Sequence, residues 1–217
     1  MLRRVLLVLL CACLVSCSAA QLALTKKDLD VQTKMSQAVF LELDPADKRI
    51  FLQVRDTGNS RLSLEDELIA RLEERGYSLV QSRKEADYVL QVNILSCNKT
   101  EVAAVERQLG LGYGGSIGTG ALVGGLIGTA THSPYGMATG AVVGGLAGGV
   151  GELVTGSLVK DVTYALICDM RLTEREGDAS KVHETRLAAW ANKVNLDYAQ
   201  AAPVLSQAMS SSIAGLF

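Results

Sequence analysis

The sequence predicts an α+β fold in which a single sheet-and-helix domain is interrupted by a glycine-rich transmembrane helical hairpin. Three observations lead to this prediction. Segments with alternating apolar residues occur on both sides of a central block, two amphipathic segments accompany them, and the central block is rich in glycine and almost uncharged. A period of two indicates strands, and apolar spacing of three and four residues indicates helices.

The composition suits one folded domain with an insertion. Of the 217 residues, 48% are hydrophobic and 20% are charged, which is enough apolar surface for a core and argues against a wholly disordered chain. The net charge is −2, whereas a nucleic-acid-binding surface needs an excess of basic residues. We therefore expect no nucleic acid among the partners.

The N-terminus has the pattern of an export signal. Arg3 and Arg4 precede an uncharged apolar run, Val5 to Val15, which is too short to span a bilayer comfortably. The run ends in Leu14-Val15-Ser16-Cys17, which matches the lipobox of bacterial lipoproteins. An ordinary signal that happens to end near a cysteine is the alternative. We predict a lipoprotein signal peptide over residues 1–16.

Cys17 is the predicted lipid-attachment site, and Cys13 is a poorer candidate. In such proteins the thiol receives diacylglycerol and the new amine an N-acyl chain, so no cofactor beyond these covalent groups is expected. Each buried CH₂ contributes about 0.8 kcal/mol, so several chains anchor firmly. Lipoproteins kept at the inner membrane typically carry Asp at the next position, so Ser18 favours the outer membrane. Residues 17–37 are expected to form a lipidated tether or a short helix.

The first half of the split domain, residues 38–107, is expected to hold four strands and one helix. Ser63 is the expected N-cap of the helix over 63–75, acids in its first turn suit the helix dipole, and Gly76 is the expected stop. Tyr88, Leu90, Val92 and Ile94 give the clearest strand alternation. The predicted strands are Ala38–Leu43, Ile50–Val54, Tyr77–Val80 and Ala86–Leu95.

The second half, residues 153–217, is expected to complete the same sheet. Alternation predicts a strand over Val162–Leu172 and a weaker one over Lys181–Trp190, and apolar spacing predicts a final helix over Ala199–Leu216. The two predicted helices should cover one face of the sheet.

Two cysteines, Cys97 and Cys168, remain after the signal is removed. A disulfide is an option in an oxidising compartment. Yet strand alternation places Cys97 on the face of Asn93 and Leu95, and Cys168 on the face of Leu166, so the two thiols point to different faces unless a bulge intervenes. Two buried thiols are therefore the favoured prediction.

The block over residues 108–152 is predicted to be a glycine-zipper membrane hairpin. Sixteen of the 21 glycines lie in Gly110 to Gly151, and His132 is the only titratable side chain of acidic or basic type between Arg107 and Glu152. Four-residue spacing places glycines on one helix face, where they let two backbones approach closely. The packing glycines are Gly120, Gly124, Gly128, Gly136, Gly140, Gly144 and Gly148.

The length of the block also suits a bilayer. Two segments of about 17 residues, at 1.5 Å per residue, make helices about 25 Å long. A flexible soluble linker is the alternative, but linkers favour serine and polar residues, whereas this block contains Ala, Val, Leu and Ile. One hairpin buries only part of its glycine surface, so we also expect a homo-oligomer, with a closed ring as the natural arrangement.

No enzymatic chemistry is predicted. His132 and His183 are the two histidines, and neither lies in a cluster with metal-ligand spacing. Acids such as Glu65-Asp66-Glu67 fit a solvated helix face. The glycine pattern over 110–115 formally fits a dinucleotide fingerprint but lacks the required acid before Glu152. The catalytic and metal sites are therefore expected to be none.

Segments spread over the whole mature chain carry a specific family resemblance. They are Thr25–Ser36, Val39–Glu42, Ile50–Val54, the glycine-rich block, Lys160–Tyr164, Ala191–Leu196 and Pro203–Leu205. In these segments the chain resembles the TraT family. The resemblance implies an outer-membrane lipoprotein of conjugative plasmids that mediates surface exclusion, confers complement resistance and forms homo-oligomers.

The resemblance also implies roles for parts of this chain. Cys17 would be the lipid site, the glycine block would be the membrane region, and a pilus or mating-pair component of the donor cell would be a partner. The chain looks shorter than the family pattern between Glu174 and Lys181, which puts functions located there in doubt. From the residues alone, a ring-forming channel or secretion component and a structural envelope lipoprotein remain alternatives.

Overall fold

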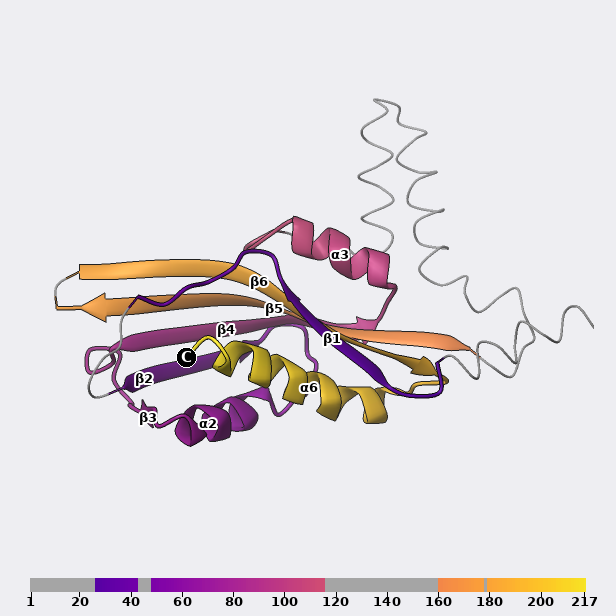
Figure 1. Ribbon diagram of the computed structural model, residues 1–217, viewed down its shortest axis with the longest axis horizontal. Coiled ribbons are helices and arrows are strands. Elements are labelled where there is room, and N and C mark those ends of the chain that lie inside the picture. The colour runs from indigo at the N-terminus through magenta and orange to yellow at the C-terminus, as the bar shows by residue number, and fades with distance from the viewer. Residues whose placement is uncertain (1–25, 43–47, 116–159, 178) are drawn as a thin grey trace, which may run out of the picture.

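The computed structural model describes residues 26–42, 48–115, 160–177 and 179–217, and these form an α+β fold (Figure 1). A curled, mixed six-stranded sheet has the strand order β1-β6-β5-β4-β2-β3. The elements are β1 (Asp30–Met35), β2 (Arg49–Asp56), α2 (Leu64–Glu74), β3 (Ser78–Leu79), β4 (Tyr88–Lys99), α3 (Val102–Gly110), β5 (Asp161–Glu176), β6 (Ala179–Val194) and α6 (Tyr198–Ala214).

The sheet joins strands from both sides of the glycine block, as predicted. β4 pairs antiparallel with β5, and β5 pairs with β6 along their whole length of 16 residues each. The predicted strands at 50–54, 77–80, 86–95, 162–172 and 181–190 and both predicted helices are confirmed. Among the described residues, no helix is both long and apolar enough to cross a membrane.

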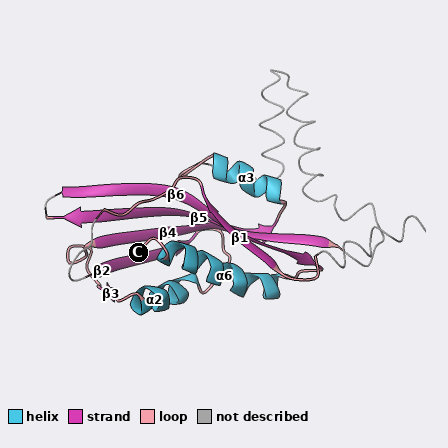
Figure 2. Cartoon of the chain, in the orientation of Figure 1, coloured by secondary structure: helices cyan, strands magenta, loops and turns pink. Residues whose placement is uncertain are grey.

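Apolar side chains at alternate positions define the main core face of the sheet. Leu90 and Ile94 of β4 and Met170 of β5 are fully buried there. α2 and α6 lie side by side over this face, as predicted (Figure 2). Leu68 of α2 and Leu205 of α6 are also completely buried, and full burial of one such side chain contributes about 1.5–3 kcal/mol.

The opposite face carries α3, a helix that the sequence analysis did not predict. Val105 and Leu109 of α3 pack against Ile167 of β5 and Trp190 of β6 in a second, smaller core. The helix is only nine residues long and ends at Gly110, where the glycine-rich composition begins. Because the helix is short and runs directly into the glycine-rich block, its apolar spacing is difficult to recognise in the sequence. Residues 108–115, which belong to the predicted hairpin segment, are thus the end of this helix and the turn that follows.

Two predictions near the N-terminal edge were wrong. Part of the predicted tether, residues 30–35, is strand β1, which pairs antiparallel with β6. Its polar residues suit a sheet edge. The strand predicted over 38–43 is absent from its described part, 38–42. The Thr185 hydroxyl accepts a hydrogen bond from the backbone N–H of Gln37 and donates one to the Gln37 carbonyl. These side-chain hydrogen bonds take the place of backbone pairing with β6, so β1 ends before Gln37.

A β-bulge in β4 changes the faces of the two cysteines. The register shifts between Ile94 and Ser96, so Leu95 is an extra residue without a partner in β5. Beyond the bulge, Cys97 therefore points into the main core, where Cys168 also lies. The predicted placement on opposite faces was wrong for this reason. Both cysteines are buried and free, as the favoured prediction had it.

Gly58 fits directly against this bulge. Its backbone N–H and that of Thr57 both donate to the Ile94 carbonyl, at 3.1 and 2.9 Å. A Cβ atom on Gly58 would lie 2.6 Å from the Leu95 carbonyl oxygen and 2.9 Å from the Ser96 Cα. Since both obstacles are backbone atoms, they cannot move aside without disturbing the β4 ladder.

We expect Gly58→Ala to lower the free energy of unfolding by about 1–3 kcal/mol, because the added methyl group must displace the β4 backbone. Urea denaturation followed by circular dichroism measures this. Gly110→Ala is the matched control, since a Cβ there meets nothing within 4 Å and should leave stability unchanged or slightly higher. Equal effects of the two substitutions would contradict the steric argument.

We expect Cys97 and Cys168 to resist alkylation in the folded protein. Burial raises the pKa of Cys97 to about 11, against a smaller opposing effect from its hydrogen bond with Tyr198, and burial raises the pKa of Cys168 too. Only the thiolate reacts, so about one Cys97 thiol in a thousand is ionised at pH 8. Mass spectrometry after iodoacetamide treatment should show labelling of both only in denaturant. Rapid labelling at pH 8 without denaturant would refute this.

Candidate membrane-attachment site

Three described positions border the segments predicted to enter lipid. The described chain begins at Lys26, nine residues after Cys17. It next ends at Gly115, inside the predicted block over residues 108–152, and resumes at Lys160, eight residues after that block. Cys17, His132 and the seven packing glycines lie outside the described residues. The geometry around these three positions shows how the domain holds the chain next to the segments outside the described residues.

Lys26 and Lys160 are held at the same end of the sheet, next to Asp161 and Val194. The Lys26 ammonium pairs with the carboxylate of Asp161, and the Lys26 carbonyl accepts a hydrogen bond from the Val194 N–H at 3.2 Å. Lys160 donates its N–H to the Asn195 side-chain oxygen at 2.9 Å, and its carbonyl accepts from the Asn195 N–H at 2.8 Å. The chain that follows the predicted anchor thus meets the chain that returns from the glycine block.

The side chain of Asn192 reinforces this junction. Its amide donates to the Asp161 carboxylate and to the Thr163 hydroxyl, both at 2.7 Å. The Lys26–Asp161 pair is more than a third exposed on both sides, and exposed pairs contribute roughly 0–1 kcal/mol each. Here the backbone hydrogen bonds around Asn195 and Val194, rather than the ion pair, fix the geometry.

The other border, at Gly115, is held by a buried arginine. Arg186 of β6 is completely inaccessible to solvent, and its guanidinium binds the Asp169 carboxylate of β5 through two hydrogen bonds of 2.7 and 3.0 Å. The same guanidinium donates to the carbonyls of Gln108, at 3.3 Å, and Gly115, at 2.6 Å. One side chain thus ties β5, the end of α3 and the first residues of the glycine block together.

The carboxylate of Asp169 completes this buried cluster. It also accepts a hydrogen bond from the backbone N–H of Gly114 at 2.9 Å. The turn can follow this path because Gly112 and Gly114 have φ angles of +66° and +72°, in the left-handed region that favours glycine. The cluster therefore depends on two glycines in the adjacent turn, and it fixes the path of the chain up to Gly115.

Sequence reasoning missed Arg186 and Asp169, although a signal was present. Asp169 lies between Cys168 and Met170 inside a predicted strand, and Arg186 directly precedes the apolar run Leu187–Trp190. A charge within such a pattern is rarely buried without a partner. The pairing could not be identified, because it depends on the β5–β6 register and on α3.

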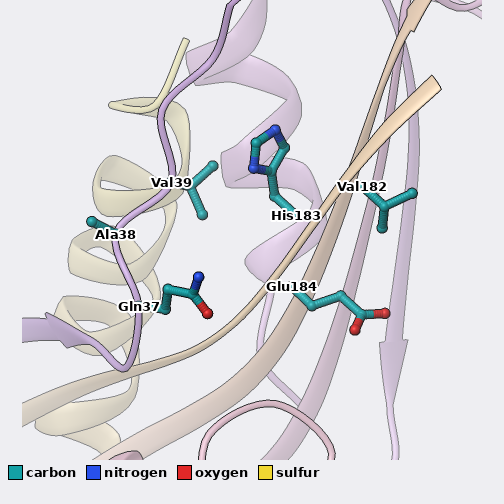
Figure 3. A pocket seen from close by; sticks show the side chains of 6 residues that line it. All are labelled: Gln37, Ala38, Val39, Val182, His183 and Glu184. Carbon is teal, nitrogen blue, oxygen red and sulfur yellow. The ribbon is translucent and has the colours of Figure 1, made fainter. Parts of the chain in front are cut away.

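His183, the described histidine, lies in a separate shallow pocket of about 210 Å³ between residues 37–39 and β6 (Figure 3). Its ring lies on the Val39 side of β6, whereas Val182 and Glu184 point to the other side. Nε2 contacts the buried carboxylate of Glu174, which also accepts the N–H of Glu42 at 2.9 Å. The pair holds the segment after β1 against the sheet.

We expect Arg186→Met to lower the free energy of unfolding by about 3–5 kcal/mol, because Asp169 would stay buried without its counter-charge. The double variant Arg186→Met, Asp169→Leu should recover much of this loss. Chemical denaturation of the three proteins measures both effects.

Lys34→Met is the control for this comparison. It removes a pair with Glu106 in which both side chains are 57% exposed, and it should change stability by less than about 1 kcal/mol. If Arg186→Met proves as mild as Lys34→Met, the buried cluster does not hold the glycine turn as described.

Comparison with known sequences gives one consistent family. A model for the enterobacterial TraT complement resistance protein matches residues 28–184. A TraT complement resistance protein of Escherichia coli is 32% identical over 228 residues, which cover 92% of this chain and 91% of the relative. A protein of the same name from Wigglesworthia glossinidia brevipalpis is 20% identical over 99% of this chain and 96% of its own length.

Among solved structures, the chain is similar to two structures of the PelC dodecamer from Paraburkholderia phytofirmans, one of them a single-site variant. The identity is 8% in both cases, and the TM-scores are 0.36 for the variant and 0.34 for the other structure. Each alignment covers 87% of this chain and 97% of the PelC chain.

Proposed function

The chain belongs to the TraT complement resistance protein family, and we propose that it performs surface exclusion and serum resistance, the two functions for which this family is known. Members of the family are non-enzymatic, surface-exposed outer-membrane lipoproteins. In this proposal the domain is fixed to the membrane at the two junctions described above. At the recipient surface it hinders stable pairing with a donor cell that carries a like plasmid. A pilus or mating-pair component of the donor is the proposed partner.

The junction at Lys26 carries this proposal. Lys26 is nine residues after Cys17, and nine extended residues span at most about 30 Å. Acyl chains on Cys17 therefore keep the Lys26 end of the sheet close to the membrane. Lys160, at the same end, brings the return of the glycine block to the same place. Two membrane elements that meet at one end of a rigid sheet favour a fixed orientation of the domain.

The organisation that we propose keeps the predicted segments. Residues 1–16 are the signal peptide, Cys17 is the acylated residue, and residues 108–152 contain a membrane hairpin that interrupts the domain. The glycines at four-residue spacing, from Gly120 to Gly148, pack the two hairpin helices and neighbouring copies. The homo-oligomer, with a closed ring as its simplest form, would bury the glycine surface that one hairpin leaves open.

We expect Cys17→Ser to abolish labelling by radioactive palmitate and to release the protein from the outer-membrane fraction. Without the anchor, recipient cells should accept a related plasmid as often as cells that lack the protein. Their survival in serum should likewise fall to the level of cells that lack the protein. Mating frequency, serum survival and fractionation are the measurements. Cys97→Ser, which removes a buried thiol, is the matched control and should leave all three unchanged.

The contribution of the hairpin is separated from that of the anchor by a second variant in the same cells. Gly124→Leu with Gly144→Leu keeps the lipid site and should still be labelled, but bulky side chains would separate the packed helices. Mass measurement in mild detergent should then show smaller assemblies, whereas Val123→Leu should not change them. Full exclusion by the unlabelled Cys17→Ser protein would overturn the proposal.

A further inference from the structure

An open polar groove of about 250 Å³ lies on the sheet face that carries α3. The apolar contacts of α3 on this face are with Leu95, Ile167, Trp190 and their neighbours. Beyond that contact, no helix of the described residues packs on the face over β2, β4 and β5. The groove is lined by Gln53, Arg55, Gln91, Val92, Asn93, Tyr113, Asp169 and Arg171.

Strand register aligns the polar side chains of this groove in two adjacent rows. In one row Gln53, Gln91 and Arg171 are direct neighbours on β2, β4 and β5, and Glu184 of β6 follows. In the other row the neighbours are Arg55, Asn93, Asp169 and Arg186. Residues two apart on a strand share a face, so both rows point to the same side. The groove thus offers amides flanked by guanidinium groups.

The charge of the groove is positive, although the whole chain has a net charge of −2. Asp169 is neutralised by Arg186 at 2.7 Å, and Glu184 lies 3.6 Å from Arg171. Arg55 makes no ion pair with any residue that the structure describes. Arg83 donates to the Gln53 side-chain oxygen and lies over the Phe51 ring, so it brings a further positive charge to the rim. Four arginines therefore face two carboxylates.

Tyr113 forms one wall of the groove. It belongs to the glycine turn that the Arg186–Asp169 cluster holds, and the residue is 40% exposed. The Tyr113 hydroxyl interacts electrostatically with the charged groups of Glu184, Arg171 and Asp169. A tyrosine ring combines an apolar surface with a polar tip. One aromatic ring, three side-chain amides and the guanidinium group of Arg55 therefore line a groove of about 250 Å³.

We propose that this groove binds an anionic saccharide, namely a sugar ring that carries a phosphate or carboxylate group. Arg55 and Arg171 bind the anionic group, because planar guanidinium groups match phosphate and carboxylate oxygens. Gln53, Gln91 and Asn93 exchange hydrogen bonds with the ring hydroxyls, since an amide both donates and accepts. The apolar face of the sugar lies against Tyr113.

The test uses the full mature protein in a detergent without a sugar headgroup, and isothermal titration calorimetry with four probes. Glucose 6-phosphate and glucuronic acid represent the phosphate and carboxylate forms. Glucose tests the need for the anion, and inorganic phosphate tests the need for the sugar. We expect glucose 6-phosphate or glucuronic acid to bind at least about tenfold more tightly than glucose, and glucose 6-phosphate to bind more tightly than inorganic phosphate.

Variants locate the site. Arg55→Gln with Arg171→Gln should weaken binding of the anionic sugars by about tenfold or more, as expected from the loss of two charge-assisted contacts. Tyr113→Ala should weaken the binding of glucose 6-phosphate but not the binding of inorganic phosphate. Arg75→Gln removes one positive charge at the end of α2, on the opposite side of the sheet, and should have no effect. Circular dichroism confirms that each variant is folded.

Four results would overturn the proposal. Absence of binding to every sugar would exclude the site. Equal affinity for glucose 6-phosphate and inorganic phosphate would exclude the sugar, and equal affinity for glucose and glucose 6-phosphate would exclude the anion. Undiminished binding by the folded double-arginine variant would place the ligand elsewhere. None of these outcomes bears on surface exclusion, which the mating assay tests separately.

Discussion

A fully buried guanidinium group sets the constraint on which much of this structure depends. Removing Arg186 from water is costly unless each of its donors finds an acceptor, and the sheet alone supplies only the Asp169 carboxylate. The remaining acceptors are carbonyls at the end of α3 and at Gly115. The position of α3, the path of the glycine turn and the burial of Asp169 are therefore one arrangement, in which each part is incomplete without the others.

The same reasoning explains why an insertion as long as the glycine block can interrupt a sheet. β4 and β5 are neighbours in the sheet but lie on opposite sides of the block in sequence. At one border of the block the buried cluster holds Gly115, and at the other border hydrogen bonds to Asn195 hold Lys160. Gly115 and Lys160 are thus both held by the domain, and the ladder between β4 and β5 forms across the insertion.

The sequence was sufficient where local patterns decide the structure. Alternation in β4 and β5 and the apolar stripes of α2 and α6 predicted those elements and their shared core face. It was insufficient where a tertiary contact decides. β1 exists because β6 offers an edge, and the face of Cys97 depends on the bulge at Leu95. Cys17 and the glycine spacing were visible as patterns, whereas the Arg186 cluster required the β5–β6 register and a helix that the composition hid.

The long β5–β6 hairpin has a mechanical consequence. Sixteen residues at about 3.3 Å each place the turn at Gly177 roughly 50 Å from the Lys26–Asp161 junction. β5 also pairs with β4 and β6 with β1, so the whole sheet would turn with the hairpin. For a domain attached to the membrane at that junction, as proposed, a tilt of about ten degrees moves the far turn by about 9 Å. A load on the Gly177 turn would then fall on the hydrogen bonds of Asn192 and Asn195.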